Sequence, residues 1–128
     1  TGFASRHVSS IDIAPNRTQA VIGTIHGWAY IFDLSTGEII ETLIQGETDA
    51  NNTASPINAL DWRPDGQRVL ATDEEPRVRL YNAQTGELRS TLETHRFNAD
   101  AAAFNPTGDR LAVASIAGTL RLWRLMTR

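Results

Sequence analysis

Short apolar runs separated by turn-forming residues follow one another along the whole chain. In "VRLY" (78–81) and "LRLW" (120–123), apolar and polar residues alternate, which places successive side chains on opposite faces of an extended strand. None of the runs has the spacing of an amphipathic helix. The pattern predicts an all-β protein built from many short antiparallel strands joined by tight turns.

The apolar runs recur in three copies, each centred on a proline. A large apolar residue lies two positions before each proline, and an aromatic residue lies seventeen positions after it. Anchors that agree at fixed offsets in three copies indicate a structural repeat. The anchors are Ile13, Pro15 and Phe32 in the first copy, Trp62, Pro64 and Tyr81 in the second, and Phe104, Pro106 and Trp123 in the third.

Each copy is expected to supply up to four short strands. The third strand of a copy contains the aromatic anchor, and the fourth follows a Thr-Gly turn that only the first two copies contain. The third copy is therefore expected to contribute three strands. The predicted first strands are 8–13, 57–62 and about 99–104, the second strands 20–24, 68–72 and 110–115, and the fourth strands 38–43 and 87–92.

The turn after each first strand begins with the anchor proline. Pro-Asp-Gly (64–66) and Pro-Thr-Gly (106–108) combine the fixed φ of proline with a glycine that accepts positive φ. The first copy has Pro-Asn-Arg (15–17) instead. Because asparagine tolerates the left-handed region better than most residues, we expect Asn16 to adopt it.

These features resemble blades of the WD-repeat (WD40) β-propeller family. The resemblance is carried by Phe32-Asp33, the Pro-Asp-Gly turn, "GTLRLW" (118–123) and the pair Thr94-His95. It implies a propeller segment of three four-stranded antiparallel blades, the last lacking its outer strand, and it implies that His95 is the family's structural histidine. The implied blades lie at about 7–44, 56–93 and 97–128, with a loop at 45–55.

The family's characteristic polar residues are only partly present. Its buried hydrogen-bond network is therefore expected to be incomplete in every copy, with the blades held mainly by apolar packing. The family's Trp-Asp pair is replaced by Phe32-Asp33, Tyr81-Asn82 and Trp123-Arg124, and its turn aspartate by His26, Glu75 and Ala117.

Three blades do not close a ring, because propellers have about four to eight of them. An open stack leaves blade faces and strand edges uncovered, which favours aggregation. Three explanations stay open from the sequence: the chain is a segment of a longer propeller, two copies form a six-bladed ring, or a different chain completes the ring.

Composition narrows the possible functions. The net charge of −3 and the pI of about 5.5 argue against a nucleic-acid surface, and the absence of cysteine excludes disulfides and thiolate metal sites. No apolar run approaches the roughly 20 residues that span a bilayer. Nothing resembles a targeting segment, so the cytoplasm is favoured although the compartment is not determined.

Motifs for catalysis, phosphate binding or calcium binding are not found. The three histidines fall in three different copies, so we expect no metal site and no cofactor. Asp61 and Asp65 flank a tight turn and are expected to be solvated turn acids. The chain is therefore expected not to be an enzyme.

The remaining candidates lie in loops that the resemblance places on one rim of the propeller. Their acidic members form either a surface for a basic peptide or protein, or ordinary solvated loops. Trp28 is either an interface anchor or a residue packed against a neighbouring blade. The candidate partner-binding residues are His26, Trp28, Glu47, Asp49, Asp73, Glu74 and Glu75.

The leading functional hypothesis is a non-catalytic scaffold, in which a rigid propeller platform binds a protein or peptide partner through its loop face. Two alternatives stay open. The chain is the propeller portion of a larger enzyme or sensor, or it is a structural subunit of a multiprotein assembly.

Overall fold

The computed structural model describes residues 7–45, 55–94 and 98–125. These residues form only strands, turns and bends, so they include no helix that could cross a membrane. The strands are β1 (Val8–Ile13), β2 (Gln19–Thr24), β3 (Ala29–Asp33), β4 (Ile39–Ile44), β5 (Ala59–Trp62), β6 (Arg68–Thr72), β7 (Arg77–Asn82), β8 (Leu88–Glu93), β9 (Ala101–Phe104), β10 (Arg110–Ala114) and β11 (Leu120–Arg124).

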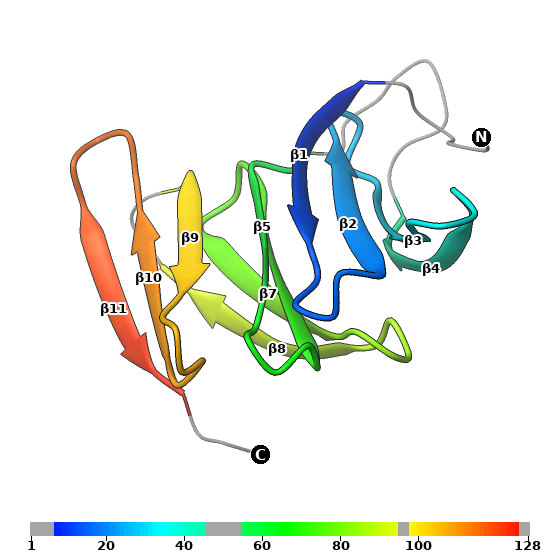
Figure 1. Ribbon diagram of the computed structural model, residues 1–128. Coiled ribbons are helices and arrows are strands. Elements are labelled where there is room, and N and C mark those ends of the chain that lie inside the picture. Colours follow the sequence, from blue (N-terminus) through cyan, green and yellow to red (C-terminus); the bar gives the residue numbers. More distant parts are fainter. Residues whose placement is uncertain (1–6, 46–54, 95–97, 126–128) are drawn as a thin grey trace.

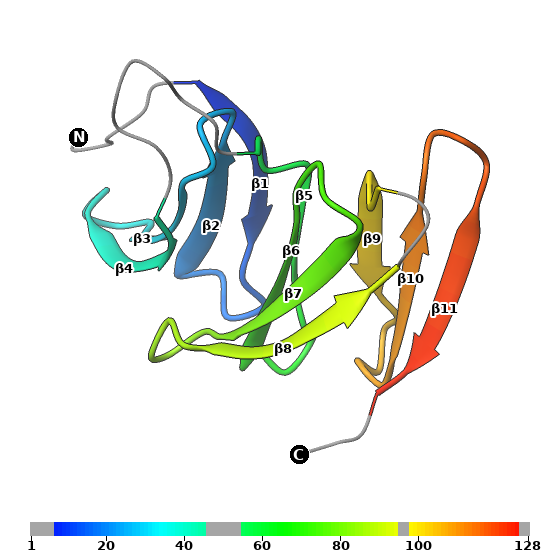
Figure 2. The same cartoon turned by 180° about the vertical axis from the view of Figure 1, so that it is seen from behind.

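The strands form three antiparallel sheets, which we call blades 1, 2 and 3. Blade 1 contains β1 to β4, blade 2 contains β5 to β8, and blade 3 contains β9 to β11, each in sequence order. The blades stand side by side, and their first strands β1, β5 and β9 are neighbours (Figures 1 and 2). The predicted all-β fold of three repeated sheets, the third with three strands, is confirmed.

Aspartate or asparagine at the end of the third strand holds the turn to the fourth. Asp33 Oδ1 accepts hydrogen bonds from the main-chain N–H groups of Ser35 (2.8 Å) and Thr36 (3.2 Å). In the equivalent turn of blade 2, Asn82 Oδ1 accepts hydrogen bonds from the main-chain N–H groups of residues 84 and 85. The second residue of the family's Trp-Asp pair is thus a turn-capping residue here, and blade 3 has Arg124 in its place.

The turn between β1 and β2 corrects one expectation. Arg17 has the positive φ (66°), and Asn16 does not. Asn16 instead accepts a hydrogen bond from the main chain of Thr18 (2.9 Å). Arg17 occupies the place of Gly66 (φ 76°) and Gly108 (φ 79°), so the geometry of this turn is kept even where the glycine is not.

Two of the three apolar clusters lie between blades, and the third lies within blade 1. The first joint, between blades 1 and 2, buries a cluster that includes Ile31, Ile57 and Trp62. The second joint, between blades 2 and 3, buries a cluster that includes Leu70 and Leu111. At the two joints, side chains of neighbouring blades together complete a core.

Candidate functional site

The rim of the fold is formed by the turns between the second and third strands. A polar side chain caps each of them: Thr24, Asp73 and Ser115 occupy equivalent places. Each side-chain oxygen accepts a hydrogen bond from the main-chain N–H two residues later, at distances of 3.3, 3.1 and 3.0 Å. The rim is therefore built on internally fixed main chain.

Asp73 lies in the interior, which corrects its expected place on an acidic surface. Its Oδ2 accepts hydrogen bonds from Arg77 (2.7 Å) and Arg79 (3.0 Å), both on β7. The Asp73 carboxylate raises the pKa of Arg77 by this hydrogen bond. These two arginines thus neutralise the negative charge of Asp73, which the sequence analysis had proposed as a contact for a basic partner.

Trp28 is also buried, and its ring stacks on Tyr30 at 5.7 Å. Tyr30 stacks in turn on Phe32 at 6.2 Å, so that two rings on one face of β3 and the ring of Trp28 just before it form a ladder of three aromatic rings. Trp28 therefore packs within its own blade, which corrects the alternative of packing against a neighbouring blade. Its main-chain N–H donates to Thr24 Oγ1 (3.1 Å).

The exposed part of the predicted surface is small. Glu74 and Glu75 are exposed, and Glu75 accepts a 3.4 Å hydrogen bond from Ser55. His26, on the equivalent turn of blade 1, is half-buried, and its ring lies 5.6 Å from that of His7. The predicted contacts Glu47 and Asp49, and the predicted structural histidine His95, lie outside the described residues.

Among the residues that the structure describes, no group of three or more potential ligands could hold a metal ion. The sequence missed a different polar arrangement at the joints. Asp12 Oδ2 accepts a hydrogen bond from the Trp62 main chain (2.8 Å), and Asp61 Oδ2 accepts one from Phe104 (2.8 Å). A carboxylate three residues before the proline therefore ties the first strand of one blade to that of the next.

Asp61 is consequently not the solvated turn acid that we expected. Burial and, to a smaller extent, the neighbouring carboxylate of Asp12 together raise its pKa to about 6, against the lowering effect of the hydrogen bond from Phe104. Asp65 behaves as expected, because its hydrogen bond with Arg63 lowers its pKa at an exposed turn. The equal offset of Asp12 and Asp61 from Pro15 and Pro64 was a signal in the sequence, but blade 3 has Ala103 in this position.

A second feature that the sequence did not indicate is a basic groove of about 330 Å³ between blades 2 and 3. Burial lowers the pKa of Arg68, and the nearby charges of Arg63 and Arg89 lower it further. Arg63, Arg68 and Arg89 belong to blade 2 and Arg124 belongs to blade 3, so no single motif marks the four arginines. The groove is lined by Arg63, Arg68, Leu80, Arg89, Ser90, Leu92, Trp123, Arg124 and Leu125.

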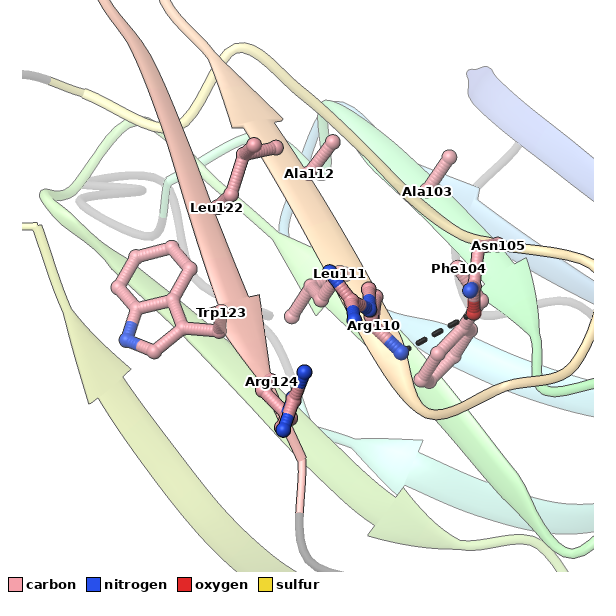
Figure 3. Close-up of a pocket in the computed structure, with 9 residues that line it drawn as sticks. All are labelled: Ala103, Phe104, Asn105, Arg110, Leu111, Ala112, Leu122, Trp123 and Arg124. Atoms are coloured by element: carbon pink, nitrogen blue, oxygen red, sulfur yellow. Dashed lines mark hydrogen bonds between the residues drawn. The ribbon is translucent and has the colours of Figure 1, made fainter.

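Blade 3 has a second, more apolar hollow, which Figure 3 shows in close-up. Leu122, Ala112 and Ala103 are cross-strand neighbours on β11, β10 and β9, and they lie on one side of the sheet. Trp123 points away from them and packs with the apolar cluster of the second joint. This side of blade 3 has no neighbouring blade among the described residues.

Comparisons with known proteins agree with this architecture. Residues 45–99 match the Anaphase-promoting complex subunit 4 WD40 domain, and residues 86–124 match the WD domain, G-beta repeat. The β-propeller domain of Cps50 (Swd1) from Myceliophteria thermophila superposes with a TM-score of 0.80 and 20% identity, over 96% of this chain and 37% of that one.

Two curated relatives are similar in sequence. Human striatin is 23% identical over 121 residues, or 94% of this chain. The Target of rapamycin complex subunit wat1 of Schizosaccharomyces pombe is 38% identical over 71 residues, which is 54% of this chain. The chain spans only 16% and 22% of the lengths of these relatives. The family matches and the geometry of the three blades in the described residues together show that this chain belongs to the WD-repeat β-propeller family.

Proposed function

We propose that the chain is a non-catalytic scaffold whose blades hold a loop rim against a protein or peptide partner. The observation that carries the proposal is the turn after β6, where Glu74 and Glu75 are exposed on main chain that buried Asp73 fixes from inside. A preorganised loop loses little conformational entropy when it binds. One relative is named as a subunit of the target of rapamycin complex, which agrees with a role among protein partners.

The partner that suits this rim is a basic peptide. Glu74 and Glu75 supply two exposed carboxylates, and Glu47 and Asp49 belong to the same proposed surface by their place in loop 45–55. His26 adds an imidazole on the equivalent turn of blade 1. Trp28 and Asp73 both lie inside the fold, so in this proposal they support the rim from within and do not touch the partner.

The test is titration of the intact chain with a fluorescent arginine-rich peptide, followed by anisotropy. The variant Glu74→Gln/Glu75→Gln is expected to weaken binding about tenfold at low salt, because two rim charges are lost. The matched control is Glu38→Gln/Glu87→Gln, which removes two exposed carboxylates from the equivalent turns after β3 and β7. If both double variants bound the arginine-rich peptide with equal affinity, the proposal that the rim binds it would be refuted.

A second candidate function, a structural subunit of a larger assembly, is favoured by one observation. Both end blades expose large apolar side chains: Ile11 and Ile13 on β1, and Leu120 and Leu122 on β11. Exposed apolar patches of this kind are typical of surfaces that pack on other protein. Light scattering should then give a multiple of the 14.1 kDa chain mass, and Leu120→Ser/Leu122→Ser should lower it. A monomer that keeps its protected amides would contradict this candidate.

A further inference from the structure

We propose that two carboxyl groups link the first strands of the three blades in one chain of hydrogen bonds, and that this chain is a pH-sensitive latch between blades 1 and 2. In the closed latch, protonated Asp61 donates a hydrogen bond to the carboxylate of Asp12. Loss of that proton replaces the hydrogen bond by a repulsion between two negative charges. The latch involves neither the loop rim nor its basic partner, so it is independent of the function proposed above.

Each of the two carboxyl groups holds the main chain of the following blade. Asp12 Oδ2 on β1 accepts a hydrogen bond from the N–H of Trp62 on β5 (2.8 Å). Asp61 Oδ2 on β5 accepts one from the N–H of Phe104 on β9 (2.8 Å). The strands β1, β5 and β9 are neighbours (Figure 1), and each carboxyl stands three residues before the proline of its copy. The repeat thus brings both groups to the same level of adjacent strands.

The chain is closed by a contact between the two carboxyl groups themselves. The side chains of Asp12 and Asp61 are hydrogen-bonded to each other, and this contact is one of the causes that raise the pKa of Asp61. Two carboxyl groups can share a hydrogen bond only if one of them holds a proton. The proton belongs to Asp61, because burial is the largest cause that raises its pKa, to about 6. One oxygen of Asp61 then donates to Asp12 while the other accepts from Phe104.

The charges around the latch leave Asp12 as the group that an ionised Asp61 meets. Among the described residues, none of the ion pairs includes Asp12 or Asp61. Of the strands packed against β5, β2 and β9 have no ionisable side chain, β1 has Asp12 itself, and β6 has Arg68 at its first position. Arg63, which follows β5, forms its ion pair with Asp65 (2.8 Å).

The latch lies at a joint whose two blades are both present. Beside it, the indole N–H of Trp62 donates to the main-chain carbonyl of Asp12 (3.1 Å). The folded pKa of Asp61 lies above its unfolded value of 3.8, so the stabilisation from its proton is lost as pH rises through about 6. The first joint should then open more often. The second joint should not, because blade 3 has Ala103 at the equivalent place and an ionised Asp61 is the stronger acceptor for the Phe104 N–H.

The experiment follows hydrogen exchange of single amides in the intact 128-residue chain by NMR, between pH 5 and pH 8. After correction for the intrinsic exchange rate, protection of the Trp62 N–H is expected to fall about fivefold over this range. Protection of the Phe104 N–H should not fall. Constant protection of Trp62, or an equal fall at both amides, would overturn the inference.

Two variants assign the fall to the latch. In Asp61→Asn an amide N–H replaces the carboxyl proton as the donor at every pH, so protection of Trp62 should stay constant. The matched control is Asp100→Asn, because Asp100 also holds one main-chain N–H, that of Ile116 (2.7 Å), but does so within blade 3. This control should keep the fall seen in the wild type. Persistence of the fall in Asp61→Asn would also overturn the inference.

A second measurement separates the latch from burial of Asp61 alone. The carboxyl carbon of Asp61 is titrated by NMR in the wild type and in Asp12→Asn, and urea unfolding curves show that the variant is folded. The midpoint is about 6 in the wild type and should fall below about 5 in Asp12→Asn, since the neighbouring charge is lost and the new amide donates to ionised Asp61. An unchanged midpoint would mean that burial alone sets the pKa, and the latch would be refuted.

Discussion

The two joints between blades use the same positions of the repeat but are not equally closed. At the first joint Trp62, two residues before its proline, is only 5% exposed, and its indole N–H donates to the Asp12 main chain (3.1 Å). At the second joint Phe104 holds the equivalent place and is half-buried. Ile13, the counterpart in blade 1, has no preceding blade among the described residues and is 55% exposed. At this position of the repeat, the neighbouring blade therefore decides whether the apolar residue becomes core.

The largest expected decrease in stability follows from removal of the Trp62 side chain. Trp62→Ala should lower the free energy of unfolding by about 4 kcal/mol, because it empties a filled joint and leaves the Asp12 carbonyl without its indole donor. Phe104→Ala should cost about half as much, since less of the ring is buried. Urea denaturation of both variants measures the difference, and Leu122→Ala on the open face serves as the control. A larger loss for Phe104→Ala would show that the second joint is the stronger one.

The next effect concerns how closely the first two blades approach each other. A Cβ added at Gly23 would lie 2.5 Å from Cγ2 of Ile57, across the first joint. Gly23→Ala should therefore cost about 2 kcal/mol through overpacking. In Gly23→Ala/Ile57→Ala the 2.5 Å contact with Cγ2 is removed, while Cβ of residue 57 (2.7 Å) and Oγ of Ser10 (2.9 Å) remain close to the added Cβ. The clash is relieved in part, so the costs of the two single changes should add to more than the cost of the double change. Additive costs in a double-mutant cycle would mean that the two residues do not meet in solution.

The fold was largely predictable because the repeat determines it. The three prolines, the aromatic anchors and the Thr-Gly turns gave the strands to within two residues at most boundaries, and they gave the missing fourth strand of blade 3. Strand starts were harder to place. Ile57 and Ala99 precede β5 and β9, yet both are fully buried, because they pack into the joints without joining a sheet.

The site was less predictable, because burial depends on contacts between copies. Asp73 and Glu74 are adjacent acids in the sequence, yet one is held inside by Arg77 and Arg79 while the other is exposed. The sequence alone could not show which of these two acids is buried and which is exposed. The basic groove depends on arginines of two blades, so only the arrangement of the sheets could reveal it. By contrast, the carboxylates at the joints share an offset from proline and could have been read from the repeat.

A third prediction concerns the pH dependence of stability that the joint carboxylate of Asp61 causes. The folded pKa of Asp61, about 6, lies above its unfolded value of 3.8, so its contribution to stability is complete below pH 3.8 and is lost as pH rises through 6. The full linkage would be about 3 kcal/mol, which solvent screening of this half-exposed group reduces to about 1 kcal/mol. Asp61→Asn keeps an acceptor for the Phe104 N–H and should remove this loss between pH 4 and pH 8.

The control for this measurement is Asp65→Asn at the neighbouring turn. The pKa of Asp65 is lowered by its hydrogen bond with Arg63, so its contribution has the opposite sign: it is present above the unfolded pKa and is lost as pH falls through the folded one. Urea midpoints of the wild type and both variants, measured across this pH range, distinguish the two opposite dependences of stability on pH. If Asp61→Asn follows the wild type between pH 4 and pH 8, the carboxylate of Asp61 is not protonated at the joint.

The smallest expected effect distinguishes the first turn of blade 1 from its counterparts. Arg17 adopts a φ of 66° that a residue with a Cβ rarely takes, whereas Gly66 occupies the same place at 76°. Arg17→Gly should therefore stabilise the protein, by up to about 1 kcal/mol, because the strain is relieved at the cost of some extra chain entropy in the unfolded state. Gly66→Ala should destabilise it by a similar amount, and since nothing lies within 4 Å of the added Cβ, the cost would come from the backbone alone. Thermal unfolding of the two variants measures both effects, and a destabilising Arg17→Gly would mean that the arginine side chain contributes more to this turn than its exposed position indicates.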